Sequence, residues 1–125
     1  MPSTLMPPDR PHPALVTHLP LLRTHLESDR EFRLDQLAGI TANAPSGRVD
    51  VDAGADSARE EVRSVLEAAA RRALHDIDAA LERIRSGRYG TCLGCRRPIP
   101  VEQLRIVPQT AHCLDCQRGS EKPQP

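Results

Sequence analysis

Two Cys-x-x-Cys pairs limit what this chain of 125 residues can fold into. Cys92 and Cys95 form the first pair, and Cys113 and Cys116 form the second pair, about seventeen residues further on. Each pair places two sulfur atoms on one side of a tight turn, so two such turns can supply the four thiolates of a tetrahedral zinc site. Four thiolates fill the coordination shell of Zn²⁺ and leave no position for water or substrate. The spacing therefore predicts one zinc ion with a structural role.

Other uses of these cysteines are open at this point. Two disulfide bonds would need an oxidising compartment, and no secretory signal pattern is present, which favours the cytoplasm. A thioredoxin-like redox pair uses one Cys-x-x-Cys beside a βαβ pattern, whereas this chain has two pairs and no such pattern. His112 stands beside Cys113 as an alternative ligand, but the four sulfurs already complete the shell. We therefore expect His112 to be a solvated neighbour of the metal site.

Large aromatic side chains are nearly absent, since Phe32 and Tyr89 are the only two. A chain with so few rings cannot build a thick core, so we expect thin helix packing stabilised in part by the metal. No run of eighteen apolar residues occurs, so no membrane span is predicted.

The charges are unevenly placed although the formal net charge is zero. Between Glu27 and Asp78 stand twelve acidic and seven basic residues, a net charge of about −5. From Arg83 to Lys122 stand eight basic and three acidic residues, a net charge of about +5. The pattern predicts an acidic arm on a basic base.

The apolar pattern predicts a mainly α fold, an antiparallel helical hairpin or coiled-coil arm with a small C-terminal four-cysteine knuckle. We expect the hairpin to span residues 14–87 and the zinc finger to span 88–118. The proline-rich segment 1–13 and the tail 119–125 are expected to be disordered. A dimeric bundle, in which the apolar stripes pair between two chains, is the alternative to a monomeric hairpin.

Within the hairpin, the helices are predicted at 18–41 and 58–86, with a tip loop at 42–57. A capping box of Ser57 and Glu60 marks the expected start of the second helix, and Asp56 is a rival N-cap. The apolar stripe of the second helix repeats at spacings of three and four and consists of Val62, Val65, Leu66, Ala69, Ala73, Ile77, Leu81 and Ile84.

The region around the cysteines resembles the DksA/TraR family of bacterial regulators that bind RNA polymerase. The match is dense from about Leu81 to Gln117 and covers only the arrangement of helices further upstream. It rests on the four cysteines together with Ala80, Leu81, Glu82, Arg83, Ile84, Gly87, Tyr89, Gly90, Ile99, Pro100, Leu104 and Pro108. We expect Ile99, Leu104 and Ile106 to form an apolar cluster behind the zinc.

The resemblance implies a mechanism by insertion into the polymerase. In this family the hairpin enters the secondary channel of RNA polymerase, acidic tip residues approach the catalytic centre, and initiation changes at particular promoters. The zinc finger stays outside, and no sequence-specific DNA contact is expected. Some members also bind guanosine tetraphosphate, but no residue of this chain can be assigned to that ligand.

The tip residues that the resemblance assigns to the polymerase active centre are Asp50, Asp52, Asp56 and Ala58. The family's tip motif has two aspartates three positions apart, followed by an alanine two positions later. Asp56 and Ala58 fit the second half of this motif, whereas Ala53 stands where the first aspartate would be.

At the basic end, Arg83, Arg88, Arg96 and Arg97 are expected to contact polymerase or nucleic acid. Arg96 stands where the family commonly has glycine, so it requires either an ordinary φ or a local conformational cost. The alternative functions are a zinc module that binds nucleic acid through these arginines and a redox sensor that uses the zinc-bound thiolates. An enzyme is not expected, because a closed four-thiolate shell leaves no site for Lewis-acid chemistry.

Overall fold

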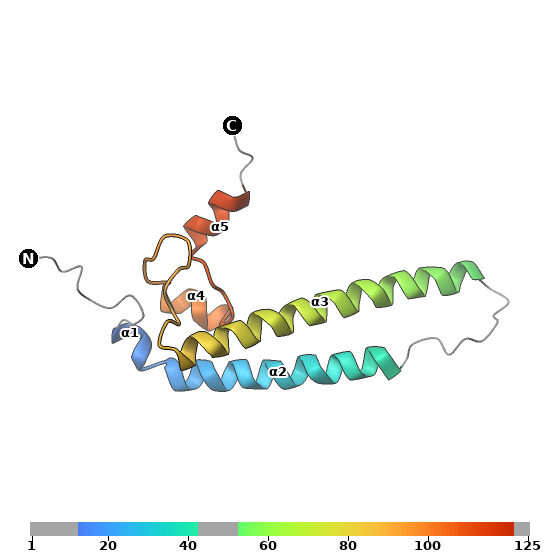
Figure 1. The fold of residues 1–125 in the computed structure, drawn as a ribbon, viewed down its shortest axis with the longest axis horizontal. Helices are drawn as coiled ribbons and strands as arrows, with labels where there is room; N and C mark the ends of the chain where they lie inside the picture. The colour runs from blue at the N-terminus through green and yellow to red at the C-terminus, as the bar shows by residue number, and fades with distance from the viewer. Residues whose placement is uncertain (1–12, 43–52, 122–125) are drawn as a thin grey trace, which may run out of the picture.

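The computed structural model describes residues 13–42 and 53–121, and this part of the chain is mainly helical, as predicted. Two long helices, α2 (Leu19–Ala42) and α3 (Ala53–Arg85), lie side by side as an antiparallel hairpin (Figure 1). The finger follows α3 and lies at the base of the hairpin. It contains α4 and α5, while α1 precedes α2, and these helices span Val101–Ile106, Leu114–Glu121 and Pro13–Val16. No helix in the described ranges is long and apolar enough to cross a membrane.

The second helix of the hairpin begins earlier than the sequence predicts. α3 starts at Ala53, five residues before the expected start at 58, so Ser57 lies inside the helix and does not cap it. Ala53 and Ala55 are strong helix formers, and their propensity extends the helix past the capping pattern. The predicted tip loop 42–57 therefore contributes its last residues to α3, and its residues 43–52 lie outside the described part of the chain.

The other end of α3 is closed by a Schellman motif around Gly87. Gly87 adopts a left-handed φ of 77°, which costs little without a Cβ atom. The backbone N–H of Gly87 donates to the carbonyl of Ile84 at 3.2 Å, and that of Arg88 donates to the carbonyl of Arg83 at 2.8 Å. These bonds satisfy the last carbonyls of the helix and turn the chain into the finger.

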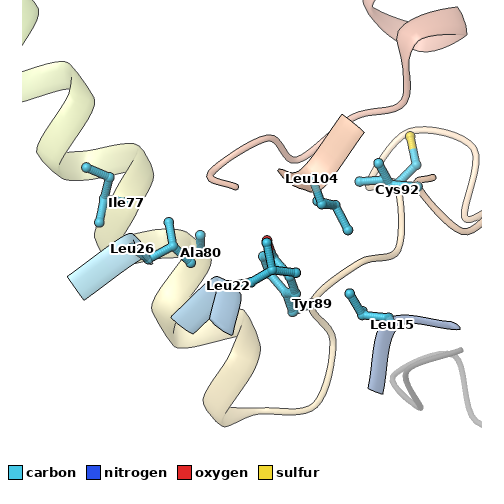
Figure 2. Close-up of a cluster of buried hydrophobic side chains, with 9 residues drawn as sticks. Leu15, Leu22, Leu26, Ile77, Ala80, Tyr89, Cys92 and Leu104 are labelled. Carbon is cyan, nitrogen blue, oxygen red and sulfur yellow. The ribbon is translucent and has the colours of Figure 1, made fainter. Parts of the chain in front are cut away.

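The core lies at the junction of the hairpin and the finger. Figure 2 shows the ring of Tyr89 between the hairpin side chains and the side chains of Leu15 and Leu104. Ile106, which the sequence assigns to the cluster behind the zinc, is 79% exposed because it ends α4 on the opposite face from Leu104. One continuous cluster of buried residues thus joins α1, α2, α3 and the finger, and it consists of Leu15, Leu22, Leu26, Ile77, Ala80, Tyr89, Cys92, Ile99 and Leu104.

An exposed ion pair between Arg30 and Asp78 shows the register of the two long helices. The Arg30 Nε donates to the Asp78 Oδ1 at 2.7 Å. Twelve residues beyond this pair along the hairpin stand Ala42, where α2 ends, and Leu66 of α3. The preceding part of α3, residues 53–65, therefore projects past α2 by about 20 Å at 1.5 Å per residue. Figure 1 shows this difference in length between the two helices.

The apolar stripe of α3 is only partly buried. Ala70, Ile77 and Ala80 face α2, but Val62 and Val65 are 59% and 67% exposed, in contrast to the prediction that they pack in the hairpin. The half-buried face continues instead through Glu67, Arg63 and Glu60, which pair with one another along the helix. Val62 and Val65 lie one and two positions from Arg63, so they point about 100° and 160° away from this half-buried face of the helix.

Replacing Tyr89 with Phe tests the hydrogen bond that holds the junction. The Tyr89 hydroxyl donates to the carbonyl of Pro108 at 2.6 Å in a buried position. The substitution keeps the ring and leaves this carbonyl without its partner, so we expect a loss of about 1–3 kcal/mol in the free energy of unfolding. Denaturant unfolding of the zinc-loaded protein measures it, and an unchanged midpoint would show that the bond contributes nothing.

The same residue predicts a pH dependence. Burial raises the pKa of Tyr89 from its ordinary 10.0 to about 12, because the phenolate would lose its hydration. The stability that the neutral phenol contributes is therefore complete below pH 10 and is lost as the pH rises through about 12. The stability difference between the native protein and Tyr89→Phe is expected to shrink over this interval, and a constant difference would contradict the assignment.

Candidate metal centre

The four cysteine sulfurs gather at one point of the finger. One sulfur from each of Cys92, Cys95, Cys113 and Cys116 lies within 4.8 Å of all the others. The Sγ atoms of Cys95 and Cys113 are 3.8 Å apart, which agrees with the edge of about 3.8 Å in a tetrahedron with Zn–S bonds of about 2.3 Å. The donor set is therefore that of one structural Zn²⁺ ion held by four thiolates, as the cysteine spacing predicts.

Backbone hydrogen bonds shape the two cysteine turns. The N–H groups of Gly94 and Cys95 point to the Cys92 sulfur at 3.3 and 3.5 Å. The N–H of Cys92 donates to the carbonyl of Arg97 at 2.8 Å, which closes the first turn. The N–H of Leu93 donates to the carbonyl of Ala111 at 2.9 Å, so the first turn is held against the segment that leads into the second.

The electrostatics of the cluster favour a cation. Burial raises the pKa of the Cys92 thiol, but N–H groups of Cys95, Cys113 and Gly94 outweigh it and bring the pKa from 9.0 to about 6. The pKa of Cys116 is raised to about 12 by the neighbouring thiols of Cys92 and Cys113. The Cys92 thiolate thus forms readily at neutral pH, whereas the Cys116 thiol resists losing its proton. A divalent cation at the centre would offset the repulsion between neighbouring thiolates and so favour loss of the remaining protons.

Gly94 lies against the second cysteine turn. A Cβ atom at this position would stand 3.1 Å from the Cys116 sulfur and 3.5 Å from Cδ2 of His112. The close approach of the two turns therefore favours glycine here, since a larger residue would push the Cys116 sulfur by a few tenths of an ångström. His112 itself is exposed and is not part of the cluster of sulfurs.

The carbonyl of His112 is held by three side chains that the sequence analysis does not single out. Gln103 Nε2 donates to it at 2.9 Å, Gln117 Nε2 at 2.8 Å and the Thr110 hydroxyl at 3.1 Å. Because His112 directly precedes Cys113, this anchor orients the second cysteine turn. No spacing rule identifies such residues, since glutamines on short helices are ordinarily solvated.

Arg96 adopts a left-handed backbone conformation, which ordinarily favours glycine. Its φ is 65°, a left-handed value, and its N–H donates to the carbonyl of Cys92 at 2.9 Å. The sequence leaves two alternatives open for Arg96, an ordinary φ or a local conformational cost. The left-handed φ shows that Arg96 has the conformational cost. The cost for a residue with a Cβ atom is about 1–2 kcal/mol.

Among the other candidate residues, Arg96 and Arg97 belong to the first cysteine turn, and the described tip residues belong to α3. Asp50 and Asp52 fall outside the described residues, and Asp56 belongs to the first turns of α3. Ala58 is exposed on the projecting part of α3. Of the basic residues, Arg88, Arg96 and Arg97 are exposed, whereas Arg83 is half-buried at the junction.

Replacing Cys113 with Ser tests the zinc assignment. The variant is expected to lose stoichiometric zinc and the fold of the finger, because metal binding supplies the folding free energy of such small sites. Elemental analysis of the purified protein gives the zinc content, and heteronuclear NMR reports the fold. His112→Ala is the matched control, since it keeps the carbonyl that the glutamines hold, and it is expected to retain one zinc. A Cys113→Ser protein with full zinc would contradict the assignment.

Replacing Arg96 with Gly tests the strained turn. Relief of the left-handed conformation is partly offset by the larger entropy of glycine in the unfolded chain, so we expect a net stabilisation of about 0.5–1 kcal/mol. Arg96→Ala removes the same guanidinium but keeps the Cβ atom, and it should leave the stability nearly unchanged. Thermal unfolding of the zinc-loaded proteins measures both, and equal melting temperatures for the two variants would argue against strain.

Comparison with known proteins agrees with the geometry of the finger. A family model described as the prokaryotic dksA/traR C4-type zinc finger matches residues 87–122. An uncharacterised protein from Aquifex aeolicus (strain VF5) is 41% identical over 49 residues, which are 39% of this chain and 34% of that protein. This chain thus spans about a third of the length of that relative.

The fold has a counterpart among solved structures. The structure of transcription factor DksA2 from Pseudomonas aeruginosa matches with a TM-score of 0.59 and 24% sequence identity, over 81% of this chain and 78% of that chain. Identity at this level shows a shared fold. The resemblance drawn from the residues around the cysteines is thereby confirmed: residues 87–122 form a zinc finger of the DksA/TraR family, and it is joined to a hairpin of the DksA2 fold.

Proposed function

We propose that this chain is a cytoplasmic bacterial transcription regulator that binds RNA polymerase and inserts its hairpin into the secondary channel to modulate initiation. The family of the finger and the shared fold with a transcription factor support a role in transcription. The proposed role is non-catalytic, because four thiolates around one metal leave no open coordination position.

The observation that carries the proposal is the projection of α3 beyond α2. Over the last 20 Å or so of the arm, α3 extends beyond the end of α2 and carries Ala58 away from the finger. A long arm of this kind can carry its far end into a channel while its base stays outside. The finger, which is wider and carries the exposed Arg88 and Arg97, would remain at the entrance.

Site-specific crosslinking tests this arrangement. A photoreactive amino acid at Ala58, which is exposed on the projecting helix, is expected to crosslink to the subunits that line the polymerase active centre. The matched probe at Glu102, which is exposed on α4 of the finger, should crosslink only to the outer surface. Binding of the chain with crosslinks from the finger alone, or no binding to polymerase, would contradict insertion.

Replacing both Asp52 and Asp56 with Asn tests the acidic tip. The double variant should fold and bind polymerase nearly as the native protein does but should alter transcription in a reconstituted assay, because the charge near the catalytic centre is lost. The control is Glu31→Gln with Asp35→Asn, which removes two exposed acids from α2 further from the tip. Equal transcription with both double variants would show that the tip carboxylates have no special role.

The same preparations address direct binding to nucleic acid, the alternative function of the basic end. Salt-dependent binding to bare DNA, together with no affinity for polymerase, would favour that alternative.

A further inference from the structure

A second polar contact lies beside the Tyr89 hydrogen bond at the junction of the arm and the finger. The guanidinium of Arg83, two residues before the end of α3, donates through one nitrogen to the carbonyls of Gln109 and Thr110 at 3.5 and 3.4 Å. The Tyr89 hydroxyl donates to the preceding carbonyl, that of Pro108. We name residues 108–110 the joint loop, because two of its carbonyls accept hydrogen bonds from Arg83 at the end of the arm and the third accepts one from Tyr89, which follows the arm in the finger.

The backbone of Arg83 also contributes to the junction of the arm and the finger. Its carbonyl accepts the N–H groups of Arg88 at 2.8 Å and Tyr89 at 3.1 Å. One residue therefore positions Tyr89 through its backbone and holds the joint loop through its side chain. The side chain is more than half-buried, and burial lowers the pKa of the guanidinium. A desolvated charge is costly unless its donors are used, so the contact with the carbonyls compensates this position.

The apolar core alone does not fix the angle between the arm and the finger. Apolar contacts are non-directional, so the cluster around Tyr89 permits small rotations of one part against the other. The hydrogen bonds from Arg83 of the arm to the carbonyls of Gln109 and Thr110 of the finger are directional and restrict such rotation. We propose that Arg83 is a positioning residue that fixes the direction of the hairpin arm relative to the zinc finger.

Because the arm is long, a small rotation at its base displaces its far end by a large distance. From Arg83 to Ala53 the helix extends about 45 Å, so a rotation of about 10° at the joint moves the far end by about 8 Å. If the arm acts inside polymerase, as proposed above, Arg83 determines which part of the channel the tip reaches. The inference about the joint itself holds for the free protein and does not depend on the partner.

Residual dipolar couplings of the zinc-loaded full chain test the inference. In the native protein, amide couplings from α3 and from α4 are expected to fit one alignment tensor, as for one rigid body. Arg83→Met keeps the length of the side chain but removes its donors, and its couplings should require two different tensors. Zinc content and helical circular dichroism should stay unchanged, which separates a loss of direction from a loss of fold.

Arg85→Met is the matched control, because Arg85 lies at the same end of α3, is exposed and pairs with Glu82 within the helix. It should retain the single tensor. If Arg83→Met fails to fold, Arg83→Lys is measured instead, and its ammonium group is expected to lose the joint loop in the same way. A folded Arg83 variant that still fits one tensor would overturn the inference, and so would loss of zinc and helix in both variants. Failure to bind polymerase would bear only on the proposed function.

Discussion

The structure depends on the side chain of Cys92, which belongs both to the apolar core and to the metal centre. Cys92 is fully buried in the apolar cluster at the junction, and its sulfur is also one of the four metal ligands. The metal centre and the core are therefore not separate modules. Order in the finger supports the packing of Tyr89 and Leu104, and through them the base of the hairpin. A chain with only one tyrosine and one phenylalanine cannot build a large core, so sharing a ligand with that core lets the metal contribute to the stability of both parts.

The geometry of the arm depends on small side chains between its helices and on the lengths of those helices. Ala70 and Ala80 are buried between the helices and allow a close approach, and the exposed pair of Arg30 with Asp78 joins the two helices in this register. The two helices end at different levels, because α3 has 33 residues and α2 has 24. In the described part of the chain, the first turns of α3 therefore extend beyond the end of α2.

Local rules explain what could be predicted from the sequence. Cysteine spacing identified the four ligands, and glycine chemistry identified the end of α3 at Gly87, since both depend on neighbours within a few residues.

The start of α3 was wrong by five residues because alanine propensity outweighed the capping pattern at Ser57. The burial of Val62 was wrong because the face of α3 that packs on α2 continues through Arg63 and Glu67, a choice that depends on tertiary packing and not on the local apolar pattern. The contacts of Arg83 also join residues far apart in the sequence. From the sequence alone, an arginine near the end of a helix is expected to be an ordinary solvated cation. The proposed tip at Asp50 and Asp52 stays a prediction, because it lies outside the described residues.

The unequal lengths of α2 and α3 also imply a gradient of local stability along the arm. In the described part of the chain, the first turns of α3 have no helix packed against them beyond the end of α2, and pairs such as Glu60 with Arg63 support their backbone hydrogen bonds, so they open at a lower free-energy cost than the base. Towards the base, opening α3 would expose Ile77 and then disturb the ligand-bearing core, which costs much of the global free energy of unfolding. The chain thus combines a base that opens only cooperatively with a far end that can rearrange independently when it meets a surface.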